Sequence, residues 1–251
     1  MFGKSFNQST HTLLATGALV LLTLGSSFAV IAQPRTPSYG LGMPRTAGTG
    51  GATRGNLPQV VMLAPDDGAR TLSDRPTFYW YVEKAPFRTT FFLRDSVDGR
   101  SKTVYKLEGK ADKPGLYRIT LPDNIRLKNN DPQRWQVRWQ DEKGVEQVDV
   151  ASAIKLEPNP KLSAQLASAK TELERARIYS ANFYWYDAFD SYTKWLEANP
   201  QDQKAIQERN TLIKAGFQSS DKITPAVMER FLARINGNTV KTSATVSPAI
   251  N

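Results

Sequence analysis

The spacing of apolar residues changes at residues 157–160, where the chain reads Glu-Pro-Asn-Pro. Before this junction, apolar residues alternate with polar residues in short runs, which is typical of β-strands. After it, apolar residues recur every three or four positions, which is typical of amphipathic helices. A strand-forming part followed by a helix-forming part predicts an α+β fold with a β-sandwich and a small helical bundle.

Seven short segments before the junction have the pattern of strands, and turn residues separate them. The segments are residues 58–65, 76–82, 88–95, 102–108, 115–122, 133–140 and 145–157. Their regular spacing predicts a seven-stranded antiparallel β-sandwich over residues 58–157. Trp135 lies near the start of a strand that follows a long connection. This position favours an immunoglobulin-like arrangement, in which an aromatic ring holds the preceding loop.

The tetrapeptide Phe-Tyr-Trp-Tyr occurs twice, and its first copy, residues 78–81, lies in a predicted strand. Because side chains alternate between the faces of a strand, Phe78 and Trp80 share one face, which we expect in the core. Tyr79 and Tyr81 share the other face. These tyrosines either pack beneath the helical part, which we favour, or stack on a sugar ring of a ligand.

The helical part, residues 158–217, is expected to contain a helical hairpin and a third helix. Thr171 and Glu174 form a capping box, which predicts the start of a helix. Residues 171–200 resemble a single tetratricopeptide-type hairpin. The residues that carry this resemblance are Ala176, Tyr179, Trp185, Ala188, Tyr192 and Pro200. No second copy follows at the repeat length of about 34 residues, so the hairpin must pack on the third helix and the sandwich.

The second Phe-Tyr-Trp-Tyr, residues 183–186, spans the predicted turn between the two helices of the hairpin. We expect Phe183 and Trp185 to point into the hairpin. Tyr184 and Tyr186 are expected to be partly exposed. Concave faces of helical repeats bind extended peptides, which makes both tyrosines candidate contacts for a partner. Packing within the protein is the simpler alternative.

The tail, residues 218–251, contains one further amphipathic helix, predicted over residues 225–236 with Thr224 as its N-cap. Its apolar stripe is expected to dock on the other helices of the protein. The alternative is a helix that binds a partner or a membrane surface, with Arg230 and Arg234 as contacts.

The first 32 residues are typical of a secretory signal peptide. Lys4 precedes an apolar run over residues 12–24, which is shorter than the roughly 20 residues of a membrane-spanning helix. Small residues then precede a predicted cleavage after Ala32. Residues 33–57 are rich in Gly, Pro and Thr, which predicts a flexible linker. We expect a periplasmic or secreted protein with no stable membrane span after signal removal.

The residue types available for catalysis are few. The chain has no cysteine, and its one histidine, His11, lies in the predicted signal peptide. The mature chain therefore lacks Ser-His-Asp and Cys-His nucleophiles and any His- or Cys-based metal site. The adjacent acids at 66–67 and 141–142 lie in predicted turns, where neighbouring side chains diverge. We predict a protein that is not an enzyme, with no catalytic residue, no cofactor and no metal ion.

The formal net charge of +9 does not by itself indicate a nucleic-acid-binding protein. Residues 58–159 carry 17 basic and 15 acidic side chains, and no segment concentrates its basic residues in one stripe. We therefore expect no nucleic-acid partner. A mildly basic surface suits weak attraction to an anionic cell-wall polymer.

Five stretches over residues 58–217 carry a resemblance to a known family. They are APDDGARTLSDRPTFYWYV, FFLRD, LPDNIRLKNNDPQRWQVRW, IKLEPNPKLSAQL and ARIYSANFYWYDAFDSYTKWLEANPQD. Their succession resembles the cyanobacterial proteins grouped as domain of unknown function 928. The resemblance implies an exported envelope protein of undefined activity and supplies no catalytic residue. Members often carry a cysteine in or after the strand that corresponds to QRWQVRW, so a role tied to that thiol does not transfer to this chain.

Two functions follow as hypotheses. The first is an exported, non-catalytic protein-interaction or scaffolding module whose partner is an unidentified envelope protein. The alternative is a polysaccharide- or peptidoglycan-binding module that uses exposed tyrosines of the sandwich, Tyr79 and Tyr81. A hydrolase that relies on carboxylates alone is a third, more remote hypothesis.

Overall fold

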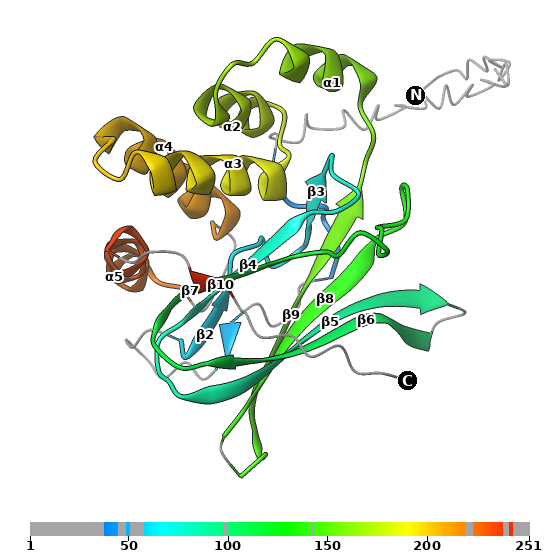
Figure 1. The fold of residues 1–251 in the computed structure, drawn as a ribbon, viewed down its shortest axis with the longest axis vertical. Coiled ribbons are helices and arrows are strands. Elements are labelled where there is room, and N and C mark those ends of the chain that lie inside the picture. The colour runs from blue at the N-terminus through cyan, green and yellow to red at the C-terminus, as the bar shows by residue number, and fades with distance from the viewer. Residues whose placement is uncertain are drawn as a thin grey trace, which may run out of the picture. The chain divides into compact units, whose positions relative to one another are not determined.

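The computed structural model describes residues 38–44, 49–50, 58–97, 100–141, 143–218, 223–237 and 241–242. The predicted signal peptide lies outside these ranges. Within them, all strands except one precede the helices, and Figure 1 shows the helices gathered beside the sheets. The α+β prediction is confirmed.

The strands of the described residues form two sheets, with the orders β1-β2-β4-β7-β10 and β3-β9-β8-β5-β6. Their bounds are Thr49–Gly50 (β1), Val60–Met62 (β2), Ala69–Thr71 (β3), Thr77–Val82 (β4), Phe87–Val97 (β5), Arg100–Ala111 (β6), Gly115–Thr120 (β7), Gln133–Gln140 (β8), Glu146–Leu156 (β9) and Lys241–Thr242 (β10). Neighbouring strands are antiparallel except β3 with β9 and β7 with β10. Each of the seven predicted segments overlaps a strand, and β5 and β6 extend beyond their predicted bounds. The predicted number was too low because β1, β3 and β10 are too short to show alternation.

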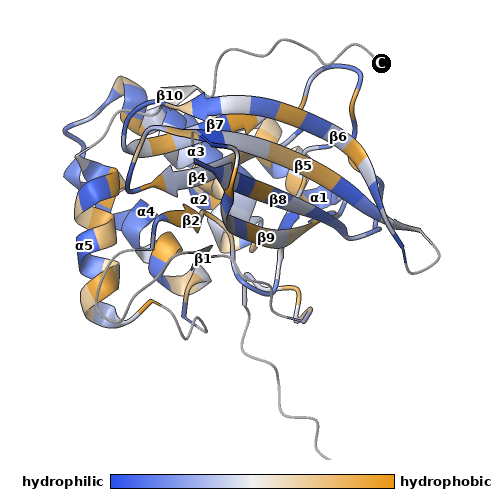
Figure 2. Cartoon of the chain, turned by 90° about the horizontal axis from the view of Figure 1, so that it is seen from below, coloured by the Kyte–Doolittle hydropathy of each residue, from blue (hydrophilic) through white to orange (hydrophobic). Residues whose placement is uncertain are grey.

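The two sheets share an aromatic core. The ring centroid of Phe78 on β4 lies 5.1 Å from that of Phe91 on β5 and 4.9 Å from that of Trp135 on β8. Hydrophilic and hydrophobic residues alternate along the second half of β6, as expected for a strand with one face on a core, whereas β5 has a continuous apolar run at Phe91, Phe92 and Leu93 (Figure 2). Every residue of β4 is buried. The sheet that contains β5 and β8 covers one side of this strand, and helices α3 and α5 cover the other.

The described residues contain five helices, which lie between β9 and β10 in the sequence. Their bounds are Pro160–Ala167 (α1), Glu172–Ala181 (α2), Trp185–Ala198 (α3), Gln203–Gly216 (α4) and Pro225–Asn236 (α5). The predicted capping box is present at the start of α2, where Thr171 Oγ1 accepts the Glu174 N–H over 3.1 Å. Within the described ranges, none of these helices has both the length and the apolar content that a membrane crossing requires.

The hairpin α2–α3 and helix α4 are fastened to the sandwich by Trp185. Its indole N–H donates to the Leu63 carbonyl oxygen over 3.0 Å, and its ring is fully buried. Gly216 at the end of α4 lies against the same ring. A Cβ atom at position 216 would come within 2.3 Å of the ring carbons, so this close approach needs glycine.

Helix α5 has the predicted bounds and packs on the protein itself. Its Phe231 ring lies 5.5 Å from the ring of Tyr81 on β4 and 6.2 Å from that of Phe217 after α4. The sheet therefore supplies part of the docking surface, in addition to the helices that were expected to supply it. The buried residues of α5 are Val227, Met228, Phe231, Leu232 and Ile235.

Two local expectations differ from the structure. The indole N–H of Trp135 donates to the Tyr186 hydroxyl of α3 and not to the loop before β8. The loop is held by Gln133, whose Oε1 accepts the Lys128 N–H over 2.9 Å. In the predicted linker, residues 38–44 and 49–50 contact the folded body. The Tyr39 hydroxyl, for example, lies 2.7 Å from Ser180 Oγ of α2.

Candidate functional site

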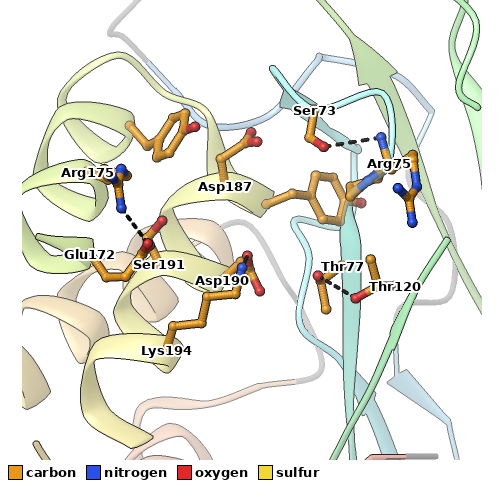
Figure 3. Close-up of a pocket in the computed structure, with 13 residues that line it drawn as sticks. Ser73, Arg75, Thr77, Thr120, Glu172, Arg175, Asp187, Asp190, Ser191 and Lys194 are labelled. Atoms are coloured by element: carbon orange, nitrogen blue, oxygen red, sulfur yellow. Dashed lines mark hydrogen bonds and ion pairs between the residues drawn. The ribbon is translucent and has the colours of Figure 1, made fainter. Parts of the chain in front are cut away.

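A cleft of about 350 Å³ lies where helices α2 and α3 meet the start of β4 and the end of β7 (Figure 3). From the sandwich, the cleft is lined by Ser73, Arg75, Thr77 and Thr120. From the helices, it is lined by Glu172, Arg175, Asp187, Asp190, Ser191 and Lys194. The site is thus built by two parts of the chain that are far apart in sequence, and its lining is mostly polar.

The helical wall is the polar face of α3. Asp187, Asp190, Ser191 and Lys194 are spaced by three, four and seven residues, so they lie on one side of the helix. The residues between them, such as Ala188 and Phe189, are buried in the core. This spacing is present in the sequence. The polar face was not predicted because the apolar stripe of the same helix gave the stronger signal.

Asp187 lies in the first turn of α3 and binds the end of β3. Its Oδ2 accepts the Leu72 N–H over 2.9 Å, and its Oδ1 accepts the Thr71 hydroxyl over 3.2 Å. Burial disfavours the charged carboxylate more than these hydrogen bonds favour it, which raises the pKa of Asp187 to about 6. Asp187 therefore changes its protonation state in the mildly acidic range.

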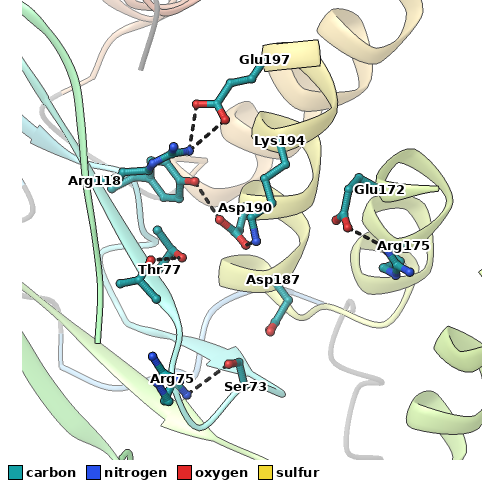
Figure 4. Close-up of polar contacts among 12 residues, drawn as sticks. Ser73, Arg75, Thr77, Arg118, Glu172, Arg175, Asp187, Asp190, Lys194 and Glu197 are labelled. Atoms are coloured by element: carbon teal, nitrogen blue, oxygen red, sulfur yellow. Dashed lines mark hydrogen bonds and ion pairs between the residues drawn. The ribbon is translucent and has the colours of Figure 1, made fainter. Parts of the chain in front are cut away.

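Asp190 lies one turn further along α3 and connects this helix to β4 (Figure 4). Its Oδ1 accepts the Tyr79 hydroxyl over 2.8 Å, and its Oδ2 pairs with Lys194 Nζ at 2.7 Å. Burial, and then the neighbouring Asp190 carboxylate, raise the pKa of Tyr79. Tyr79 therefore keeps its proton and serves as a donor to the helix.

The charged groups around the cleft also have partners. Arg175 pairs with Glu172 on α2, at 2.5 Å between Nη1 and Oε1. Arg75 pairs with Asp123, and its Nε and Nη2 each donate to the Leu121 carbonyl oxygen over 3.1 Å. These contacts hold both sides of the cleft in place before any ligand binds.

The polar lining of the cleft can offer hydrogen bonds to a polar ligand. The hydroxyls of Thr77 and Thr120 lie 2.9 Å apart on the sandwich side, opposite the carboxylates of α3. Asp187 could exchange a proton in mildly acidic solution. Among the described residues, no group of three or more His, Cys, Asp or Glu side chains is arranged to hold a metal ion.

The tyrosines predicted as ligand contacts are all buried. Tyr79 and Tyr81 are 2% and 1% exposed, so they lie beneath α3 and α5 and offer no stacking platform for a sugar. Tyr184 and Tyr186 are 3% and 2% exposed. Their predicted partial exposure was wrong, because the turn before α3 packs onto the end of β9. There Tyr184 donates to the Glu157 carbonyl oxygen, and Tyr186 donates to the Ala153 carbonyl oxygen.

The two predicted arginine contacts lie on the exposed side of α5. Arg234 Nη2 lies 3.7 Å from Glu83 Oε1, which joins the helix to the loop after β4. Neither Arg230 nor Arg234 lines the cleft. The structure therefore brings none of the predicted contacts except Tyr186 to the wall of this site.

The chain matches a known protein family. The family model described as Domain of Unknown Function (DUF928) matches residues 47–224, a range that contains the cleft and both of its walls. No curated protein matches the chain.

Proposed function

The chain belongs to the DUF928 family, and on this premise we propose that it is an exported, non-catalytic binding module of the cell envelope. In this proposal it acts as an interaction or scaffolding protein, in the periplasm or outside the cell. The cleft between α2–α3 and the start of β4 accepts a polar segment of a partner protein.

The observation that carries this proposal is that the cleft is preformed. Its helical wall is tied to the sandwich through Asp187 and Asp190, which accept hydrogen bonds from Leu72, Thr71 and Tyr79. A rigid polar cleft binds a ligand without the cost of ordering its own side chains.

The proposal includes the type of the β-sandwich and the type of the helical hairpin. We infer an immunoglobulin-like sandwich, supported by the sheet β2-β4-β7, by the sheet β3-β9-β8-β5-β6 and by the parallel pair β3–β9. A tetratricopeptide-like hairpin is supported by the buried small residues Ala176 and Ala188 where α2 and α3 meet. Proteins of both types commonly bind other polypeptides.

A blocking variant tests the partner-binding role. Thr120 is exposed and lines the cleft, so Thr120→Arg should fill the site. Thr211 is an exposed threonine of α4 outside the cleft, and Thr211→Arg is the matched control. Affinity capture from an envelope fraction should recover the same protein with the wild type and with Thr211→Arg, and lose it with Thr120→Arg. Identical recovery with all three would contradict a role of this cleft.

Export has its own test. Expression of the full chain in an organism that naturally produces it should yield a mature protein whose first residue is Gln33. Mass spectrometry of the mature protein identifies this N-terminal residue. A chain that retains residues 1–32 in the mature protein would contradict cleavage.

Binding of an anionic envelope polymer is a second candidate function, and one observation favours it. On the sheet face opposite the core, the guanidinium carbons of Arg94 and Arg138 lie 4.7 Å and 5.1 Å from the centroid of the Phe92 ring. Arginine side chains grouped around an aromatic ring suit acidic sugars. Because Tyr79 and Tyr81 are buried, the candidate residues for polysaccharide binding are Phe92, Arg94 and Arg138 on this face.

Polygalacturonate is a suitable probe for this second function. The double variant Arg94→Gln/Arg138→Gln should weaken binding to the polymer at low salt. The matched control is Lys161→Gln/Lys204→Gln, which removes the same charge from exposed helix positions. Equal weakening in both variants would show attraction by net charge alone, and this face would then have no specific role.

A further inference from the structure

A second cavity, separate from the cleft, contains a buried arginine. It measures about 450 Å³ and lies between α3, the connection to α4, α4 itself and the end of α5. Arg209 of α4 lines it, although only 5% of this residue is exposed. Long charged side chains are almost never buried to this degree unless they are paired.

Arg209 has few partners for a group with five N–H donors. Its Nη2 donates to Asn236 Oδ1 over 2.9 Å, whereas its Nε is buried without a hydrogen-bond partner among the described residues. Burial lowers the pKa of Arg209 to about 10, and the opposing contribution comes from Tyr79 and not from a carboxylate. The side chain therefore keeps its positive charge at neutral pH and lacks a counter-ion from the described part of the chain.

The cavity has a second unsatisfied polar group and an apolar wall. The Thr193 hydroxyl on α3 is buried, 1% of the residue is exposed, and this oxygen also lacks a partner among the described residues. The apolar wall consists of Leu196, Ile206 and Ile235. Glu197 also lines the cavity, but both of its carboxylate oxygens accept from Arg118, at 2.8 Å and 3.0 Å.

A purely structural role for Arg209 explains only part of these observations. Helices α3 and α5 end near the cavity, at Ala198 and Asn236, and the partial negative charge of their C-terminal carbonyl groups favours a buried cation. Those carbonyls do not accept from Arg209 Nε, and they leave the Thr193 hydroxyl without a partner. A bound anion with an apolar part would supply the missing counter-ion of Arg209 and cover the apolar wall.

We propose that Arg209 and Thr193 form a binding site for the carboxylate of a ligand whose apolar portion packs on Leu196, Ile206 and Ile235. The Nε–H and an Nη–H on one edge of a guanidinium match the two oxygens of a carboxylate. The carboxylate belongs either to a small aliphatic acid or to the C-terminus of a polypeptide. This site does not depend on the function proposed for the cleft.

Calorimetric titration of the purified protein tests the site with defined probes. Hexanoate should bind, and hexanamide, which has the same size without charge, should bind at least about tenfold more weakly. A pentapeptide that ends in a free Leu carboxylate, compared with the same peptide amidated, tests the second source. Tighter binding of the free-acid peptide than of hexanoate assigns the site to polypeptide termini, and tighter binding of hexanoate assigns it to small acids.

Three variants connect the binding to the named side chains. Arg209→Met keeps the approximate shape and should reduce hexanoate affinity at least about tenfold. Without ligand it should melt no lower than the wild type, since it removes an unpaired buried charge. Thr193→Val should reduce affinity about three- to tenfold. The exposed Lys204→Gln on the same helix is the control and should bind as the wild type does.

Arg209→Lys provides a second test in case Arg209→Met does not fold. Lysine keeps the positive charge but lacks the paired N–H donors of arginine, so the affinity of this variant for hexanoate should also fall. The proposal is overturned if the wild type binds neither hexanoate nor the free-acid peptide at about 10 mM, where Kd values of weak ligands remain measurable. It is also overturned if the Arg209 variants bind hexanoate as tightly as the wild type.

Discussion

Trp135 on β8 donates its indole N–H to the hydroxyl oxygen of Tyr186 on α3 over 2.8 Å. The same hydroxyl donates to the Ala153 carbonyl oxygen of β9 over 3.0 Å. All three groups are buried, so this pair joins the core of the sandwich to the first turn of the helix that forms the cleft. The position of the helical wall thus depends on a polar link inside an aromatic core.

Removing this link should destabilise the protein. Tyr186→Phe removes the acceptor of the Trp135 N–H and a donor to the Ala153 carbonyl oxygen, which costs about 1–3 kcal/mol of the free energy of unfolding. Denaturant unfolding measures the change. Tyr105→Phe, at a partly buried tyrosine of β6, is the control and should change the stability by less than about 0.5 kcal/mol. Equal effects of the two variants would contradict the role given to the Tyr186 hydroxyl.

Asp187 should make the stability depend on pH in the acidic range. Its folded pKa of about 6 lies above the ordinary aspartate value of 3.8, so the folded state holds this proton more tightly than the unfolded state does. The contribution of Asp187 to stability is therefore largest below about pH 4, and about 3 kcal/mol of it is lost as the pH rises through about 6.

Comparison of the wild type with Asp187→Asn isolates this effect. The wild type should gain stability relative to Asp187→Asn when the pH is lowered from about 7 to about 4.5, as measured by urea unfolding at each pH. Asp112→Asn, at an exposed position, is the control and should keep the wild-type dependence. A constant difference between the wild type and Asp187→Asn over this range would refute the raised pKa.

Gly216 should not tolerate a larger side chain. In Gly216→Ala the new methyl group would overlap the Trp185 ring, where the nearest ring atoms lie at 2.3 Å, and the resulting shift should cost about 1–3 kcal/mol. Gly237→Ala is the matched change at the end of α5, where the nearest atom lies at 3.4 Å and φ is –89°. Thermal unfolding should show a lower Tm for Gly216→Ala and little change for Gly237→Ala. The reverse order would contradict the packing of α4 on Trp185.

Docking of α5 should depend on Phe231. Replacing this fully buried ring by alanine removes its contacts with Tyr81 and Phe217 and should cost about 3–5 kcal/mol. Hydrogen exchange should then become faster in α5 before it does in the strands. Glu229→Ala removes only a surface ion pair with Lys214 and should leave the exchange of α5 near that of the wild type. Unchanged protection of α5 in Phe231→Ala would mean that other contacts hold this helix.

Local signals in the sequence determined much of the secondary structure. The alternation of Thr77–Val82 predicted a strand, and Thr224 with Pro225 predicted the start of α5 at its observed position. These predictions succeeded because periodicity and capping depend on residues that are near each other in the chain. Strand β3 was missed, since three residues carry too little pattern and their partner β9 lies far along the chain.

The candidate sites were decided by the tertiary structure. Whether a tyrosine is exposed depends on which other element covers it, and the amphipathic ring of Tyr79 or Tyr184 fits either environment. The partner of Asp187 is the backbone of Leu72, which is 115 residues away in the sequence. Arg209 is similar: a basic residue on a helix is ordinarily solvated, and only the packing of α3, α4 and α5 places this one in a cavity without a carboxylate partner among the described residues. Burial and long-range pairing arise from the arrangement of whole elements, which local sequence patterns do not specify.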